Sequence, residues 1–206
     1  MKPIFLCWCM IIMIALTSAC NQSNGGSIET MENQKFDPNS FTIESVPGSD
    51  YEMATRRDSM GVLLEMGYLK DNTRHGVWSS YHPNGLPKKV ASYINGVFNG
   101  IYQEFNERGQ LILMAHYKNN LLDGPWGKYN FGRPEMTANY VGGQLNGVYR
   151  EYDPTRLNVM LKEIEYKNGV YDGKYRFFNS EGVMTVEYVY RNGNKISGGI
   201  VEQSGE

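Results

Sequence analysis

The chain has 206 residues, of which 41% are hydrophobic and 23 are glycine, and its 20 basic and 22 acidic residues leave a net charge of −2. Such a balanced charge argues against nucleic acid as a partner and against electrostatic attachment to an anionic membrane. Of the three cysteines, Cys7 and Cys9 lie in the apolar N-terminal segment, so we expect no disulfide framework.

The first twenty residues have the features of a bacterial lipoprotein signal. Lys2 precedes an unbroken apolar run of thirteen residues, 4–16. At about 1.5 Å per helical residue this run reaches roughly 20 Å, short of a hydrocarbon core of about 30 Å. It therefore predicts a signal peptide over residues 1–19. The Leu-Thr-Ser-Ala-Cys sequence that ends at Cys20 resembles the lipobox, so we expect Cys20 to be lipidated. An ordinary secretory signal that happens to contain Cys20 is the alternative.

Residues 20–50 are polar and predict a tether that carries the lipidated cysteine. A flexible segment of this length would hold the folded part on the order of 30 Å from the membrane. Alternatively, Phe36, Phe41 and Ile43 add a short capping strand to the folded part.

A repeat dominates residues 51–198, and a short tail, 199–206, follows it. Five segments of the form Tyr-x-Asn-Gly, or close to it, are spaced 24, 23, 26 and 24 residues apart, and Tyr68 stands 25 residues ahead of the first. A fixed period in this range predicts an array in which each unit buries its apolar face against its neighbours. The five segments begin at Tyr93, Tyr117, Tyr140, Tyr166 and Tyr190.

Each unit has the pattern of one β-hairpin. Asn-Gly and Asp-Gly pairs adopt positive φ at little cost and mark tight turns. The segments between them alternate apolar and polar residues, as in Leu111, Leu113, Ala115 and Tyr117. The fold class is therefore all-β, an antiparallel meander of about ten or eleven strands.

Pairs of aromatic residues recur three positions apart on the shorter strands. An odd offset sends the two members to opposite faces, which predicts an aromatic column along each face, stacked across strands. The columns are either structural ladders or, on the less covered face, a binding platform. Their members are Trp78, Tyr81, Tyr102, Phe105, Trp126, Tyr129, Tyr149, Tyr152, Tyr175 and Phe178.

The repeated Tyr-x-Asn-Gly-x-x-x-Gly-x-(Trp/Tyr)-x-x-(Tyr/Phe) resembles the bacterial variant of the MORN repeat over roughly residues 61–198. This resemblance implies an elongated, single-layer antiparallel sheet of hairpins. Some bacterial members are labelled antitoxins, and MORN repeats have been associated with membrane attachment. The segment 153–158 departs from the pattern because it is longer than its counterparts and lacks their glycine. It is either a tolerated insertion or part of a functional surface.

No catalytic constellation is evident. His75, His82 and His116 lack nucleophilic or metal-binding partners at a recognisable spacing, and we expect them to be solvated surface residues. We therefore expect neither enzymatic activity nor a metal or other cofactor.

Two functions remain open for a protein that we expect to be anchored in the bacterial cell envelope, at the outer membrane, through its lipid. One is a protein-interaction or scaffold module, with toxin masking as a special case. The other is binding of envelope glycan or peptidoglycan strands on the aromatic columns. Tyrosine-rich surfaces suit both.

Overall fold

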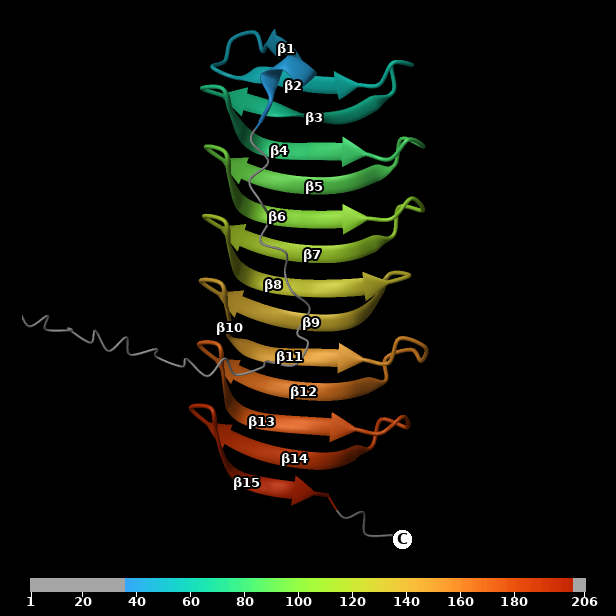
Figure 1. The fold of residues 1–206 in the computed structure, drawn as a ribbon, viewed down its shortest axis with the longest axis vertical. Coiled ribbons are helices and arrows are strands. Elements are labelled where there is room, and N and C mark those ends of the chain that lie inside the picture. Colours follow the sequence, from blue (N-terminus) through green and yellow to red (C-terminus); the bar gives the residue numbers. More distant parts are fainter. Residues whose placement is uncertain (1–35, 202–206) are drawn as a thin grey trace, which may run out of the picture. The chain divides into compact units, whose positions relative to one another are not determined.

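The structure, a computed structural model, describes residues 36–201, so the expected signal peptide and Cys20 lie outside the described residues. The described chain forms one antiparallel sheet whose strand order follows the sequence from β1 to β15 (Figure 1). The short strand β10 lies off this path and pairs with β9 alone. The predicted meander of hairpins is confirmed. No helix within residues 36–201 is long and apolar enough to span a membrane.

The described residues form fifteen strands where about ten or eleven were predicted, and only β1 lies wholly outside the expected array of residues 51–198. A 3-10 turn, η1 (Pro38–Ser40), precedes them. The strands are β1 (Thr42–Ser45), β2 (Glu52–Arg57), β3 (Leu63–Lys70), β4 (Thr73–Tyr81), β5 (Pro87–Ile94), β6 (Val97–Phe105), β7 (Leu111–Lys118), β8 (Leu121–Asn130), β9 (Arg133–Val141), β10 (Gln144–Leu145), β11 (Gly147–Tyr152), β12 (Met160–Lys167), β13 (Val170–Phe178), β14 (Met184–Arg191) and β15 (Asn194–Ile200).

The Asn-Gly turns join each unit to the one before it. Asn95 and Gly96 both have positive φ, which closes the tight turn between β5 and β6. The Gly96 amide then donates to the Arg74 carbonyl of the preceding unit at 2.8 Å. Gly143 and Gly193 donate in the same way, each at 2.8 Å to the preceding unit. The motif therefore recurs because its backbone both turns the chain and links successive hairpins.

Large aromatic and small side chains alternate across the sheet. Trp78, Ala91, Tyr102, Ala115, Trp126 and Ala138 are successive directly opposed partners on β4 to β9. The same row continues from β11 to β14 with Tyr149, Ile164, Tyr175 and Tyr188. We call the face that carries this aromatic–small row face A, and the opposite one face B.

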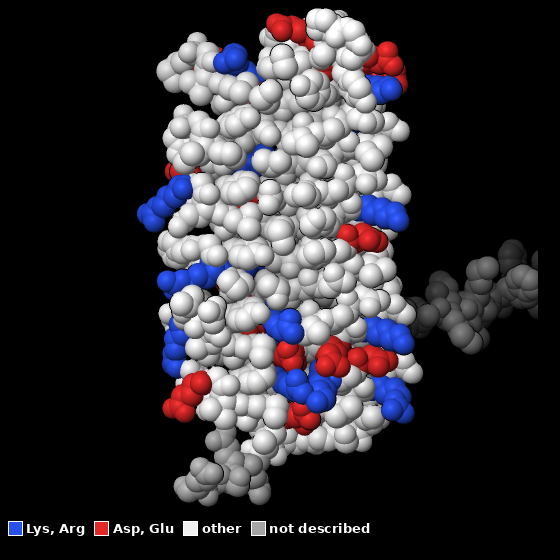
Figure 2. Space-filling model, turned by 180° about the vertical axis from the view of Figure 1, so that it is seen from behind, with Lys and Arg blue, Asp and Glu red and all other residues white. Residues whose placement is uncertain are grey.

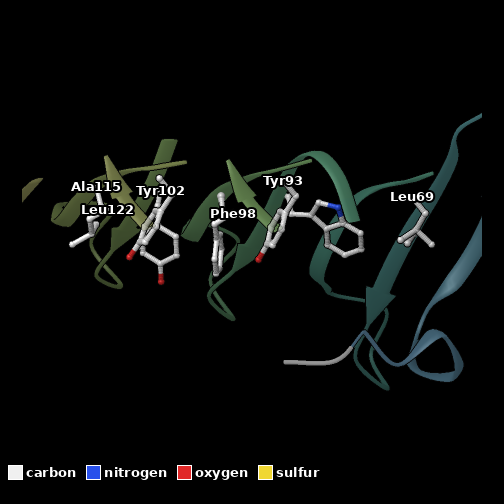
Figure 3. Close-up of a cluster of buried hydrophobic side chains, with 10 residues drawn as sticks. Leu69, Tyr93, Phe98, Tyr102, Ala115 and Leu122 are labelled. Atoms are coloured by element: carbon white, nitrogen blue, oxygen red, sulfur yellow. The ribbon is translucent and has the colours of Figure 1, made fainter. Parts of the chain in front are cut away.

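The buried core lies on face A over β2 to β8. In Figure 3 its aromatic side chains, among them Tyr93, Phe98 and Tyr102, project side by side from one surface of the sheet. Phe36 and Phe41 pack on the Trp78 ring, with ring centroids 5.7 Å away in each case. Together with β1, they form the expected alternative of a capping strand, within the range otherwise predicted to be tether.

The first unit begins one residue later than the tyrosine spacing predicts. Leu69 and Arg74 are partners beside their turn, as Tyr93 and Phe98 are in the next unit. Leu69 is fully buried and thus holds the place of the repeated tyrosine, 24 residues before Tyr93. Tyr68 is 42% exposed and falls on the other face by alternation.

Candidate binding surfaces

The aromatic side chains of the aromatic–small row on face A are buried at its N-terminal end and half-buried further along. Trp78 and Tyr102 are only 3% and 2% exposed, so both belong to the core. Trp126, Tyr149 and Tyr175 occupy equivalent positions on later strands but are half-buried. Of the predicted binding residues on face A, only these three present surface to a partner.

Tyrosines fill the open part of face A. Tyr171 lies 5.1–5.2 Å from three neighbouring rings, those of Tyr166, Tyr175 and Tyr190. Edge-to-face and tilted contacts of this kind each add about 0.5–1.5 kcal/mol beyond simple burial. Rings on face A therefore contact one another across strands, but within residues 36–201 the members of the predicted column contact other rings, mainly those of the repeated tyrosines, and not each other.

Three face A tyrosines, Tyr102, Tyr149 and Tyr175, remain protonated at any physiological pH. Burial raises the pKa of Tyr102 and Tyr149, and hydrogen bonds to Glu104 and Glu151 raise it further. The Tyr149 hydroxyl donates to the Glu151 carboxylate at 2.6 Å. Burial raises the pKa of Tyr175 to about 12. The Tyr175 hydroxyl can therefore donate a hydrogen bond to a ligand, whereas those of Tyr102 and Tyr149 already donate to carboxylates, and all three are poor bases and nucleophiles.

The second aromatic column lies on face B. The Tyr129 ring covers Gly127, where an added Cβ would lie 2.8 Å from the tyrosine hydroxyl oxygen, so the ring lies on the face opposite Trp126. The column is half-buried, and within the described part of the chain none of its rings contacts another aromatic ring. The prediction of stacked rings is wrong here, and the Tyr129 ring instead lies over Gly127 of its own strand. The column consists of Tyr81, Phe105, Tyr129, Tyr152 and Phe178.

Face B also carries a line of ion pairs over β11 to β14. Glu163 accepts hydrogen bonds from Arg150 at 2.9 Å and from Arg176 at 2.8 Å. Arg176 also bonds Glu187 at 2.7 Å, and Lys174 lies 3.8 Å from the same carboxylate. Figure 2 shows these charges gathered over one end of face B, whereas its middle is almost free of charge. Sequence reasoning missed this network, although alternating charge at directly opposed strand positions could have revealed it.

The three histidines are half-buried rather than solvated. His82 Nε2 lies 2.9 Å from the Phe105 carbonyl oxygen, and His75 packs against the Tyr51 ring at 5.6 Å. His116 lies beside Gly124. Each therefore contributes to packing between hairpins. Among residues 36–201, no three His, Cys, Asp or Glu side chains gather as potential metal ligands.

The long loop between β11 and β12 is ordered by its own side chains. Asp153 Oδ1 accepts from the amides of Thr155 and Arg156 at 2.7 and 3.0 Å. Asn158 adopts φ +58° and takes the place of the missing glycine. Arg156 donates to the Ser180 carbonyl in the next unit's loop, so the insertion lies against its neighbour.

Two segments of the chain match the MORN repeat variant, residues 74–95 and 98–119. They correspond to β4 with β5 and to β6 with β7, two adjacent hairpins of the closed part of the array. No curated protein matches the chain. Repeats of this class are in general non-catalytic modules for interaction with proteins or membranes. The chain is therefore an array of hairpins in which two adjacent units are similar to the MORN repeat variant.

Proposed function

We propose that the protein is a non-catalytic interaction module, held at the cell envelope by a lipid on Cys20, that binds a protein partner on face B. The observation that carries this proposal is the face B aromatic column. Its rings recur once per hairpin, are half-exposed and make no ring contacts with each other in the described chain. Tyrosine and phenylalanine in such positions supply contact area at a low cost in side-chain entropy.

The uncharged middle of face B supports the same proposal. Val77 and Ile101 are 54% and 46% exposed there. Protein interfaces combine an apolar, aromatic centre with a polar rim, and here the ion pairs of β11 to β14 border the apolar part (Figure 2). Masking of a toxin would be one form of this binding.

A full-length chain, purified with its lipid, tests the proposal in detergent-solubilised envelope. Phe105→Ala with Tyr129→Ala should reduce capture of a defined set of proteins. The matched control, Tyr149→Ala with Tyr175→Ala, removes two half-buried rings from face A and should leave capture unchanged. Circular dichroism confirms that both variants fold. Equal loss in both variants, or capture that is insensitive to either, would contradict binding on face B.

A second candidate function is glycan binding on face A. It is favoured by the open aromatic positions Trp126, Tyr149 and Tyr175, and by the Glu151 carboxylate, which bonds Tyr149 and lies 2.9 Å from Lys162. Flat rings beside charged hydrogen-bonding groups suit sugar faces and hydroxyls. Co-sedimentation with cell-wall material that is lost in the Tyr149→Ala, Tyr175→Ala variant would assign this function instead.

The anchor has its own test. Cys20→Ser removes the residue proposed to carry the lipid and should release the protein from the membrane fraction or leave it unprocessed. A variant that loses its signal peptide and still sediments entirely with membranes would show that another attachment exists.

A further inference from the structure

One rim of face B, at the Asn-Gly turns, carries a contiguous line of basic and aliphatic side chains. The last partnered residues before each turn form this line, which we call the turn rim. In order along the sheet the pairs are Lys70 and Thr73, Ile94 and Val97, Lys118 and Leu121, Val141 and Gln144, Lys167 and Val170, and Arg191 and Asn194. Each pair neighbours a face A pair such as Tyr93 and Phe98, so alternation places it on face B.

The side chains of the turn rim are exposed and adjacent. Ile94, Leu121, Val141 and Val170 are 45%, 53%, 53% and 45% exposed. A Cβ on Gly143, in the next turn, would lie 3.6 Å from the Leu121 side chain, so successive turns contact one another. Since consecutive turns are two strands apart, the pairs repeat at roughly 10 Å.

Three of the four cations of the turn rim form no ion pair among the described residues, whereas Lys70 lies 3.9 Å from the Asp50 carboxylate. No carboxylate within residues 36–201 forms an ion pair with Lys118, Lys167 or Arg191, and all three are exposed. In contrast, Asp123 accepts the Gly142 amide at 3.1 Å and Asp172 accepts the Asn192 amide at 3.3 Å. In Figure 2 basic side chains recur along this edge, with acidic side chains beside several of them. The amide hydrogen bonds offset only part of the charge of Asp123 and Asp172, so the rim presents its exposed cations at intervals, separated by aliphatic surface and by these two carboxylates.

We propose that the turn rim binds an acidic segment of a protein partner, one whose carboxylates alternate with aliphatic side chains. This inference rests on the proposed protein-binding function and assigns it a second surface. A protein segment can place its carboxylates at the cations and its aliphatic groups at Ile94, Leu121 and Val141. An anionic lipid surface is uniform, so it would also face Asp123 and Asp172, and like charge disfavours that contact.

The test uses the full-length chain with Cys20→Ser, which cannot carry lipid. The rim variant adds Lys118→Glu, Lys167→Glu and Arg191→Glu. Its matched control adds Lys88→Glu, Arg108→Glu and Arg133→Glu, three exposed cations beside the opposite set of loops, with the same change in net charge. The probes are a synthetic peptide of alternating glutamate and leucine, the equivalent lysine and leucine peptide, and vesicles of phosphatidylglycerol or phosphatidylcholine.

The glutamate peptide should bind the parent chain in a salt-sensitive manner and lose about tenfold in affinity with the rim variant, because three exposed ion pairs are removed. The control variant should bind as the parent does, and the lysine peptide should not bind. Absence of glutamate-peptide binding, or equal loss in the control, would overturn the proposal. Rim-dependent binding to phosphatidylglycerol vesicles in place of the peptide would assign the rim to lipid. If the rim variant retains all binding while Phe105→Ala with Tyr129→Ala loses envelope capture, the proposed function stands and this inference fails.

Discussion

Between β4 and β9 the aromatic–small row alternates Trp or Tyr with Ala, whereas between β11 and β14 Ile164 and Tyr188 replace the alanines. In the first region Trp78 and Tyr102 are buried, at 3% and 2% exposure, whereas Trp126, which also lies between two alanines, is half-buried. In the second region Tyr149, Tyr175 and Tyr188 are all half-buried.

The ion pairs on face B follow the opposite distribution. They link Arg150, Glu163, Arg176 and Glu187 across the region where face A buries least. The same turn motif and period thus support mainly apolar burial in the N-terminal half, where Glu65 also pairs with Arg56 and Arg74, and a longer line of ion pairs in the C-terminal half. Each unit depends mainly on its neighbours in such an array, so the two halves are expected to respond separately to perturbation.

The largest expected effect is that of Trp78→Ala. This ring is buried beneath Phe36 and Phe41, and its removal should cost about 3–5 kcal/mol. The equivalent change in the second region, Tyr175→Ala, should cost clearly less because that ring is half-exposed. Urea denaturation of both variants measures the difference, and equal losses would remove the distinction between the two halves.

Gly67→Ala should have the next largest effect. An added Cβ would overlap the Trp78 ring, so either the ring or the strand must move, at a cost of about 1–3 kcal/mol. Gly199→Ala is the matched control, because nothing lies within 4 Å of the added group. A Gly67→Ala protein as stable as the control would show that the Trp78 ring does not pack closely on Gly67.

Glu163→Gln should weaken the second region alone. The carboxylate joins Arg150 and Arg176 and is 13% exposed, so its loss should cost about 1–2 kcal/mol, between the values for exposed and buried pairs. Hydrogen exchange should show faster opening of β11 to β14 with β4 to β8 unchanged. Faster exchange throughout the sheet would indicate a single cooperative unit.

Acid should also act on the second region. The hydrogen bond from Arg176 lowers the pKa of Glu187, and Lys174 adds to this. A carboxyl whose folded pKa is depressed stabilises the fold above its unfolded pKa of about 4.3, and this contribution is lost as pH falls through the folded value. Glu187→Gln should therefore reduce the stability difference between pH 7 and pH 3, measured by urea denaturation, whereas Glu181→Gln in an exposed loop should not.

The smallest effect is expected for the long loop. Shortening 153–158 to the pattern of residues 179–182 should change stability by no more than about 0.5 kcal/mol, because loop length contributes weakly. Thermal denaturation checks this, and a loss well beyond that value would mean that the Arg156 contact with Ser180 is part of the packing between units.

The sequence predicted the hairpins and their period because turn residues and alternation are local properties. It did not predict which rings are buried, because the burial of Trp78 depends on Phe36 and Phe41, which are about forty residues away. The tyrosine spacing placed the first unit one residue too early, at Tyr68. The buried side chain at the repeated position is that of Leu69.

The candidate surfaces were predicted only in part. The odd offset placed Tyr129 and Trp126 on opposite faces correctly, but ring contacts on face B could not be judged without the tilt of each ring. The turn rim was not predicted, because a net charge near zero does not show where the cations gather in the fold. Its cations are spread over distant turns and become neighbours only when the sheet brings those turns together.

Native-state hydrogen exchange at low and at high salt tests most directly the claim that the two halves depend on ion pairs to different extents. Raising the salt concentration screens partly exposed ion pairs but leaves buried apolar contacts intact. We expect protection to fall in β11 to β14 and to hold in β4 to β8. An equal change in both regions, or a loss confined to β4 to β8, would contradict the account.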